Sequence, residues 1–174
     1  MARLHMLPVL AAAALLGLPA MAQQRVSPHE QTSVTIDGKK ITIEYGRPYM
    51  KGRKIFGGLV PLGEVWRAGA DEATVLTTDA DLTIGSLRVP KGSYALFVIP
   101  QANAWTLVVN KVAKQWGAFN YDQSKDLGRT PMKVTTSGSP IEQFTISLET
   151  AGPKRGVLKM AWERTVATAD FSVD

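Results

Sequence analysis

Residues 32–45 read TSVTIDGKKITIEY, in which apolar and polar residues alternate on both sides of Asp37-Gly38. An Asp-Gly pair between two alternating runs favours a β-hairpin with a two-residue turn. The pairs expected across this turn are Ile36 with Lys39, Val34 with Ile41, and Thr32 with Ile43. One face of the hairpin then carries a consistent apolar set, as a correct register requires. That set is Val34, Ile36, Ile41, Ile43 and Tyr45.

Other segments with a β pattern follow along the chain. Residues 94–99 are apolar at every position, as in a strand buried on both faces, whereas 105–110 alternates more weakly. The remaining predicted strands are 73–78, 82–84, 87–89, 143–149, 158–163 and 167–173. We therefore expect an all-β fold, a single antiparallel β-sandwich that is jelly-roll-like, with eight or nine strands. At most one short helix is expected, near residues 121–125, and no strand is predicted between 111 and 142.

The N-terminal residues have the features of a secretory signal. Arg3 precedes an apolar run over residues 6–18, and the run ends in the small-x-small sequence Ala20-Met21-Ala22. This pattern predicts a signal peptide over residues 1–22, a single domain over 23–174, and a periplasmic or secreted protein. No later apolar segment reaches the roughly 20 residues that a spanning helix needs, so no membrane span is expected after cleavage.

The composition excludes several kinds of site. The 174 residues include no cysteine and two histidines, of which only His29 follows the predicted signal. Cys/His zinc sites, iron–sulfur clusters and thiol nucleophiles are therefore excluded, and we expect no metal and no cofactor. The net charge of +5 is mild, with scattered cations, so nucleic acid is not an expected partner.

A glycine-rich basic loop over residues 46–63 is the first candidate binding element. It carries Arg47, Lys51 and Arg53, and freed backbone N–H groups beside such cations could hold an anion. The spacing is not that of a Walker loop. The alternative interpretation is structural: an arginine packed under a strand crossing that pairs with Glu44 or Glu64.

Two further segments place aromatic and charged residues together. Trp66-Arg67 precedes Asp71-Glu72, and adjacent carboxylates on a strand point to opposite faces unless a turn intervenes. Trp116, Phe119 and Tyr121 lie in a polar loop with Asp122, which is typical of a sugar-stacking platform. The structural alternatives are a core Trp66, a buried ion pair at Arg67, and loop aromatics that fold back onto the sandwich.

Motifs across nearly the whole mature chain also resemble a known family. They include Ser27-Pro28-His29-Glu30, Lys51-Gly52-Arg53-Lys54-Ile55-Phe56-Gly57, Val65-Trp66-Arg67-Ala68-Gly69-Ala70 and Asp126-Leu127-Gly128-Arg129. In number and order they resemble the bacterial exported family called domain of unknown function 2911. The resemblance implies an exported single domain and no particular chemistry. Asp71 stands where that family often has an uncharged polar residue.

The sequence thus favours an exported binding or interaction module for a glycan or an anionic ligand. The candidate ligand-binding residues are Arg47, Lys51, Arg53, Trp66, Arg67, Glu72, Trp116, Tyr121 and Asp122. For one shared site their three loops must converge on one concavity, and we expect Arg47 and Arg67 to be partly or fully buried beside carboxylates.

Other functions remain open. One is a metal-independent hydrolase of envelope or extracellular polymers that uses carboxylates from Glu44, Asp71, Glu72, Asp122 or Asp126. Arg47, Arg53 or Arg67 would stabilise charge in that reaction. Another is a structural envelope protein whose basic face contacts anionic polymers. A protein partner is also open, and His29 is expected to be a surface residue near the terminus.

Overall fold

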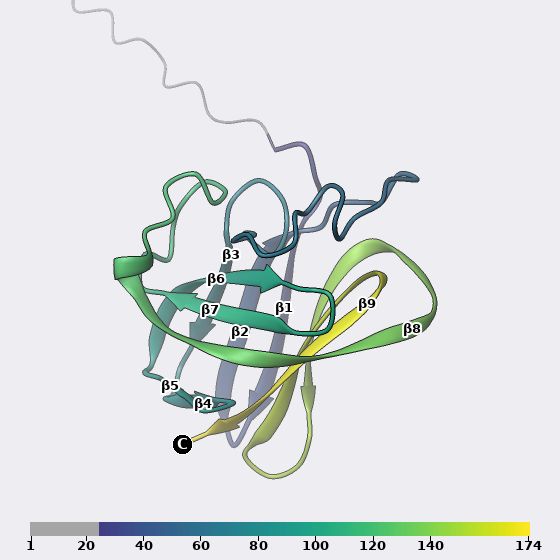
Figure 1. Ribbon diagram of the computed structural model, residues 1–174. Coiled ribbons are helices and arrows are strands. Elements are labelled where there is room, and N and C mark those ends of the chain that lie inside the picture. Colours follow the sequence, from purple (N-terminus) through teal and green to yellow (C-terminus); the bar gives the residue numbers. More distant parts are fainter. Residues whose placement is uncertain (1–24) are drawn as a thin grey trace, which may run out of the picture.

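The computed structural model describes residues 25–174, and the predicted signal peptide lies outside this range. These residues form nine antiparallel strands and one 3-10 turn, which confirms the all-β class and the strand number (Figure 1). The strands are β1 (His29–Ile36), β2 (Lys39–Gly46), β3 (Thr74–Thr78), β4 (Leu82–Ile84), β5 (Leu87–Val89), β6 (Gly92–Pro100), β7 (Trp105–Asn110), β8 (Asp126–Thr150) and β9 (Arg155–Val173). The 3-10 turn covers Gln123–Lys125, inside the region predicted for a short helix.

The first hairpin has the predicted register. Asp37 and Gly38 have φ angles of 51° and 72°, as a two-residue turn with two left-handed positions requires. Ile36 pairs with Lys39, and the ladder continues as far as His29 opposite Gly46. β1 therefore begins three residues before the predicted Thr32, and His29 opens the strand.

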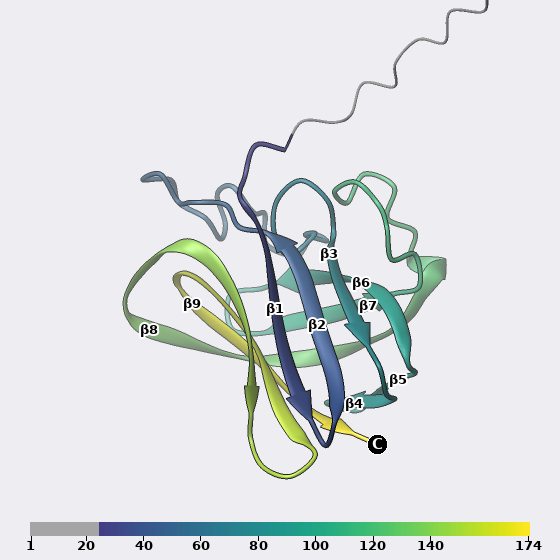
Figure 2. The same ribbon diagram turned by 180° about the vertical axis from the view of Figure 1, so that it is seen from behind.

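β8 links the two parts of the sheet. The strand order is β1-β2-β3-β6-β7-β8-β9-β4-β5, so consecutive strands are neighbours over most of the sheet. Residues 126–132 of β8 pair with β7, and from Lys133 onward β8 pairs with β9. Its register shifts between Thr136 and Thr145, and the strand sweeps from one layer to the other (Figures 1 and 2). The expectation of no strand between residues 111 and 142 was wrong from residue 126 onward, because pairing with β7 and β9 makes this polar stretch extended.

The main core lies between the two parts of the folded sheet. Ile43, Leu96, Leu107 and Met160 are fully buried there. At one end of this core Trp66, Trp105, Trp162, Phe56 and Phe144 form an aromatic cluster, in which Trp66 and Trp162 stack with ring centroids 6.0 Å apart. A smaller cluster around Phe97 covers the other face of β6, which explains why residues 94–99 are apolar throughout.

No helix among residues 25–174 is long and apolar enough to cross a membrane.

Candidate functional site

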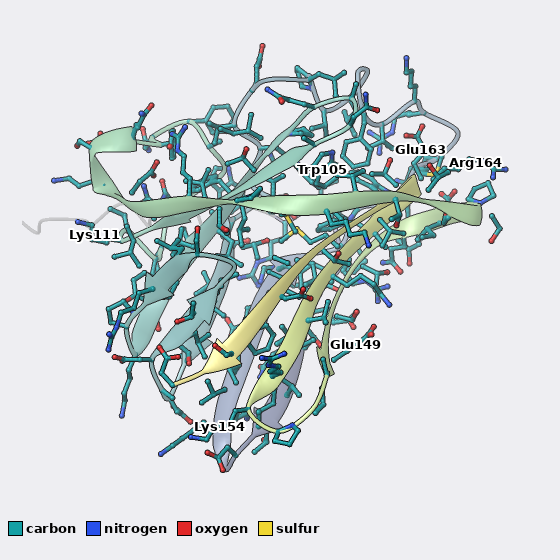
Figure 3. All side chains as sticks on the ribbon, turned by 60° about the horizontal axis from the view of Figure 1, so that its bottom comes forward. Trp105, Lys111, Glu149, Lys154, Glu163 and Arg164 are labelled. Atoms are coloured by element: carbon teal, nitrogen blue, oxygen red, sulfur yellow. The ribbon has the colours of Figure 1, made fainter. Side chains whose placement is uncertain are left out.

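All three candidate loops lie at one end of the molecule, which we call the loop end. β1 begins and β2 finishes here, and residues 47–63, 64–73 and 111–122 rise around them (Figures 1 and 2). The β1–β2 turn and the C-terminus lie at the opposite end. Figure 3 shows Lys154 there, where it forms a 3.5 Å ion pair with Asp37. The three loops therefore share one end of the molecule, but only the first two of them line the same cavity.

A cavity of about 420 Å³ opens at this end, and we call it the loop cavity. Trp66 and Trp162 from the aromatic cluster line it, together with Tyr49, which is 40% exposed. Its charged lining residues are Lys51, Arg53, Arg67 and Asp71. Residues 26–28 complete one wall. The basic loop and the Trp66–Asp71 segment thus meet in a single concavity.

Arg67 is the least satisfied polar residue of the loop cavity. Its Nε atom is buried and has no hydrogen-bond partner, and no ion pair reaches its guanidinium within residues 25–174. Burial lowers the pKa of Arg67, and the negative charge of Asp71 opposes this shift. An arginine stays protonated even so. The expected ion pair at Arg67 is therefore absent from this part of the chain, and a cation lies half-buried beside a cavity.

Asp71 is occupied by the chain's N-terminal segment. Its φ of 62° turns the backbone, and its carboxylate oxygens accept hydrogen bonds from the backbone N–H groups of Val26 (3.4 Å) and Ser27 (3.1 Å). The carboxylate thereby holds residues 25–28, which we call the strap, against the cavity.

Glu72 does not share the loop cavity with Asp71. It lines a second hollow of about 420 Å³ with His29, Glu44 and Trp116. Arg25 of the strap binds it through an Nε–Oε1 hydrogen bond of 2.8 Å, and that bond lowers the pKa of the Glu72 carboxyl. His29 Nδ1 lies 3.9 Å from Glu72. Glu72 thus anchors the strap from the other side.

Arg47 is half-buried as expected but serves as a structural connector. Its guanidinium donates to Phe144 O (3.0 Å) and Thr145 Oγ1 (2.9 Å), and it forms an ion pair with Glu30. The expected partners Glu44 and Glu64 were wrong, because β1 extends far enough to bring Glu30 beside Arg47. Arg47 does not line the loop cavity.

Lys51 and Arg53 lie at the exposed tip of the basic loop. Lys51 and Gly52 have φ angles of 50° and 70°, and Arg53 N donates to Met50 O across this tight turn. The Arg53 guanidinium folds back and donates to Met50 O (2.9 Å) and Tyr49 O (2.7 Å). Its charge is therefore held at the mouth of the loop cavity.

The 111–122 loop contributes its aromatic residues elsewhere. Tyr121 packs edge-on against Phe97, and its hydroxyl donates to Asp126 (2.7 Å). Burial first, and then the hydrogen bond to Asp126, raises the pKa of Tyr121. Asp122 caps the 3-10 turn by accepting from Ser124 N (2.9 Å). The structure therefore does not bring Trp116, Tyr121 or Asp122 into the loop cavity.

Sequence reasoning missed two components of this site. Tyr49 lies in a loop without periodicity, and only its position within the basic segment could have suggested it. The strap gives no sequence signal, because its role depends on Asp71 and Glu72, which lie more than 40 residues away. No group of three metal-binding side chains is assembled anywhere in the described range.

Fold and cavity together define an antiparallel, β-sandwich-like protein with a cation-lined cavity among its loops. A family model described as "Protein of unknown function (DUF2911)" matches residues 27–171, and the chain belongs to this family. No curated protein and no solved structure matches the chain.

Proposed function

We propose that this protein is an exported binding module whose loop cavity takes a small organic anion, with an acidic sugar as the best-fitting class. The observation that carries the proposal is the half-buried guanidinium of Arg67, which lines the cavity and has no ion-pair partner within residues 25–174. Nε has no surface open to solvent, so an anion in the cavity would contact the guanidinium through its terminal nitrogens and supply the opposite charge that residues 25–174 do not. Charge-assisted bonds from arginine to a carboxylate or phosphate are among the stronger polar contacts.

The charge balance of the cavity supports an anion. Lys51, Arg53 and Arg67 line it against one carboxylate, Asp71, so positive charge is in excess among its lining residues. An incoming anion therefore meets a net positive field in a partly enclosed space, which concentrates it further.

The apolar lining supports a ligand with a ring. Tyr49 offers an exposed aromatic face at the mouth, and Trp66 and Trp162 form the apolar floor. Sugar rings stack on such faces while their hydroxyl groups bond to polar neighbours. The volume of about 420 Å³ suits one or two sugar units.

The hydrolase alternative has weaker support. Glu44 and Glu72 share the second hollow, but Arg25 lowers the pKa of Glu72, whereas a general acid needs a raised pKa. Asp122 and Asp126 are engaged in capping and in bonds to Tyr121 and Arg129. None of these pairs offers two carboxylates in contrasting environments.

A thermal-shift experiment on the mature chain tests the proposal. Glucuronate and galacturonate are compared with glucose and galactose, which match them in ring and hydroxyl groups but lack the charge. We expect stabilisation by the acids alone, about 2.7 kcal/mol at one hundred times the dissociation constant. Arg67→Gln removes this response, and Arg88→Gln, whose surface arginine pairs with Asp81, keeps it. Equal responses of acids and neutral sugars, no response to either, or an unchanged response in Arg67→Gln would overturn the proposal.

A further inference from the structure

The large apolar side chains that remain exposed within residues 25–174 all belong to the loop end. They are Val26, Tyr49, Leu59, Leu62, Val112 and Phe119, contributed by the strap, the basic loop and the 111–122 loop. Phe119 is 83% exposed, and Leu62 is 47% exposed. Scattered exposed apolar residues need no explanation, but their concentration at one end of the molecule does.

Unpaired cations accompany these apolar residues. Lys51, Arg53 and Lys54 precede Leu59 and Leu62 in the basic loop. Lys111 and Lys114 flank Val112 in the neighbouring loop, and Figure 3 shows the Lys111 side chain extending outward from the molecule. All five are exposed, and none belongs to an ion pair in the described part of the chain.

We propose that the loop end docks on the surface of an anionic lipid bilayer. Phe119 and Leu62 would enter the boundary between head groups and acyl chains, and the surrounding lysines would contact the acidic head groups. Peripheral binding of this kind depends on buried apolar area together with electrostatic attraction to anionic lipid. It goes beyond the proposed ligand site, because Phe119, Leu62, Lys54 and Lys111 do not line the loop cavity.

The residue composition favours a bilayer over a protein partner. Lysine is depleted at protein–protein interfaces relative to the remaining surface, whereas lysine near an anionic membrane is worth about 1 kcal/mol. Here lysines lie in the same loops as the exposed apolar residues. The apolar groups also lie on separate loops, so each can enter a fluid surface independently without needing a complementary partner surface.

The test measures co-sedimentation of the mature chain with vesicles. One set is pure phosphatidylcholine, and the other contains three parts in ten of phosphatidylglycerol. We expect binding to the anionic set alone, weakened by 0.5 M salt because the attraction of exposed charges is screened. No binding to anionic vesicles, or equal binding to both sets, would overturn the proposal.

Two matched pairs of substitutions locate the docking surface. The charge reversal Lys54→Glu with Lys111→Glu should reduce vesicle partitioning by about 25-fold or more, since each lysine near the anionic surface accounts for about fivefold. Lys39→Glu with Lys40→Glu makes the same change in net charge beside the β1–β2 turn, at the opposite end, and should have a small effect (Figure 2). If the second pair weakens binding as much as the first, net charge alone governs adsorption and the loop end is not the docking surface.

The apolar contribution is tested by Leu62→Ser with Phe119→Ser. Both side chains are exposed, so the melting temperature should stay within about 2 °C of the parent. Vesicle binding that persists in moderate salt should be lost, while the glucuronate response at the loop cavity is retained. Unchanged vesicle binding would overturn the insertion of these residues. Loss of the glucuronate response in Arg67→Gln, with vesicle binding intact, separates the two proposals.

Discussion

The Nε of Arg47 donates a 3.0 Å hydrogen bond to the carbonyl oxygen of Phe144, which lies 97 positions further along the chain. The same guanidinium reaches Thr145 Oγ1 and Glu30, so one side chain joins β1, the start of the basic loop and the irregular part of β8. Its side chain is 21% exposed, and the geometry leaves little of its bonding capacity for a ligand.

Arg47→Ala should therefore lower the free energy of unfolding by about 2–3 kcal/mol, because it removes two hydrogen bonds from a charged donor at a half-buried position. Arg47→Lys keeps the positive charge but loses the planar, multiple-donor geometry of the guanidinium. It should therefore recover less than half of the lost free energy of unfolding. Urea unfolding of both variants measures the effect. The thermal-shift response to ligand should remain in the folded variants. Loss of this response in a variant of unchanged stability would contradict the structural role of Arg47.

Arg67→Met should have the opposite effect on stability. The substitution removes the buried Nε that has no partner and keeps most of the apolar stem, so the variant should unfold at or above the parent's temperature, with a gain of about 1 kcal/mol. Differential scanning calorimetry without ligand measures this difference. A clear drop in stability would mean that Arg67 has a structural partner outside the described residues.

Tyr45→Phe tests the hydroxyl group of Tyr45, which bonds to the backbone of β8 at Ile146 in the way that a neighbouring strand would. Tyr45 OH accepts from Ile146 N (3.0 Å) close to the register shifts of β8, and it lies within bonding reach of Ile146 O. Removing the hydroxyl leaves a buried backbone N–H unpaired, so stability should fall by about 1–3 kcal/mol. Amide hydrogen exchange at Ile146 should accelerate. Unchanged exchange at that amide would show that the hydroxyl does not protect it.

Gly46→Ala should disturb the segment that carries Arg67. A Cβ at residue 46 would lie 2.2 Å from the carbonyl oxygen of Ala70, a backbone atom that cannot move away alone. We expect the free energy of unfolding to fall by about 2 kcal/mol or more, and ligand binding at the loop cavity to weaken. Gly138→Ala is the matched control, since nothing lies within 4 Å of its added Cβ. Equal melting temperatures of the two variants would contradict this close approach.

The attachment of the strap should depend on pH through Glu72. The hydrogen bond from Arg25 lowers the pKa of Glu72 in the folded state, so its stabilisation is present above the ordinary glutamate pKa of about 4.3. It is lost as the pH falls through the lowered value. NMR titration of the carboxyl groups should give Glu72 a pKa below the ordinary range. In Arg25→Ala the pKa of Glu72 should rise back toward that range. Glu149, whose pKa Lys159 lowers independently, should not move and is the internal control.

Sequence patterns were sufficient where local chemistry determines the structure. The Asp37-Gly38 turn requires two left-handed residues, and alternation on both sides leaves one register that buries Ile36, Ile41 and Ile43. The same reasoning recovers β7 at its observed bounds, Trp105–Asn110. Residues 126–142 carry Pro131, Gly138 and Pro140, which argue against a strand. Pro131 is tolerated because β8 pairs at that point with β7 alone.

Interactions between distant residues could not be predicted in the same way. The sequence predicts the basic loop and the Trp66–Asp71 segment as candidate binding elements, and the structure brings both to one cavity. The predicted partners of Arg47 were wrong because the β1–β2 ladder continues to His29, beyond the alternating part of the sequence. This extension brings Glu30 beside Arg47. The Trp116–Asp122 loop has the composition of a platform, but Tyr121 gains more by packing against Phe97 and bonding to Asp126.

Because β8 passes through both layers, neither half of the chain can complete its part of the sheet without the other half. A cut at Gly138 would give one fragment with β1 to β7 and the first part of β8. The other fragment would hold the end of β8 and β9. The first fragment would lack β9, one of the two partners of β4, and the second would be a lone hairpin without the residues that cover Phe144 and Trp162. Neither fragment should fold alone, and an equimolar mixture should reassemble, so this strand offers a site for a split-protein reporter whose signal requires both pieces.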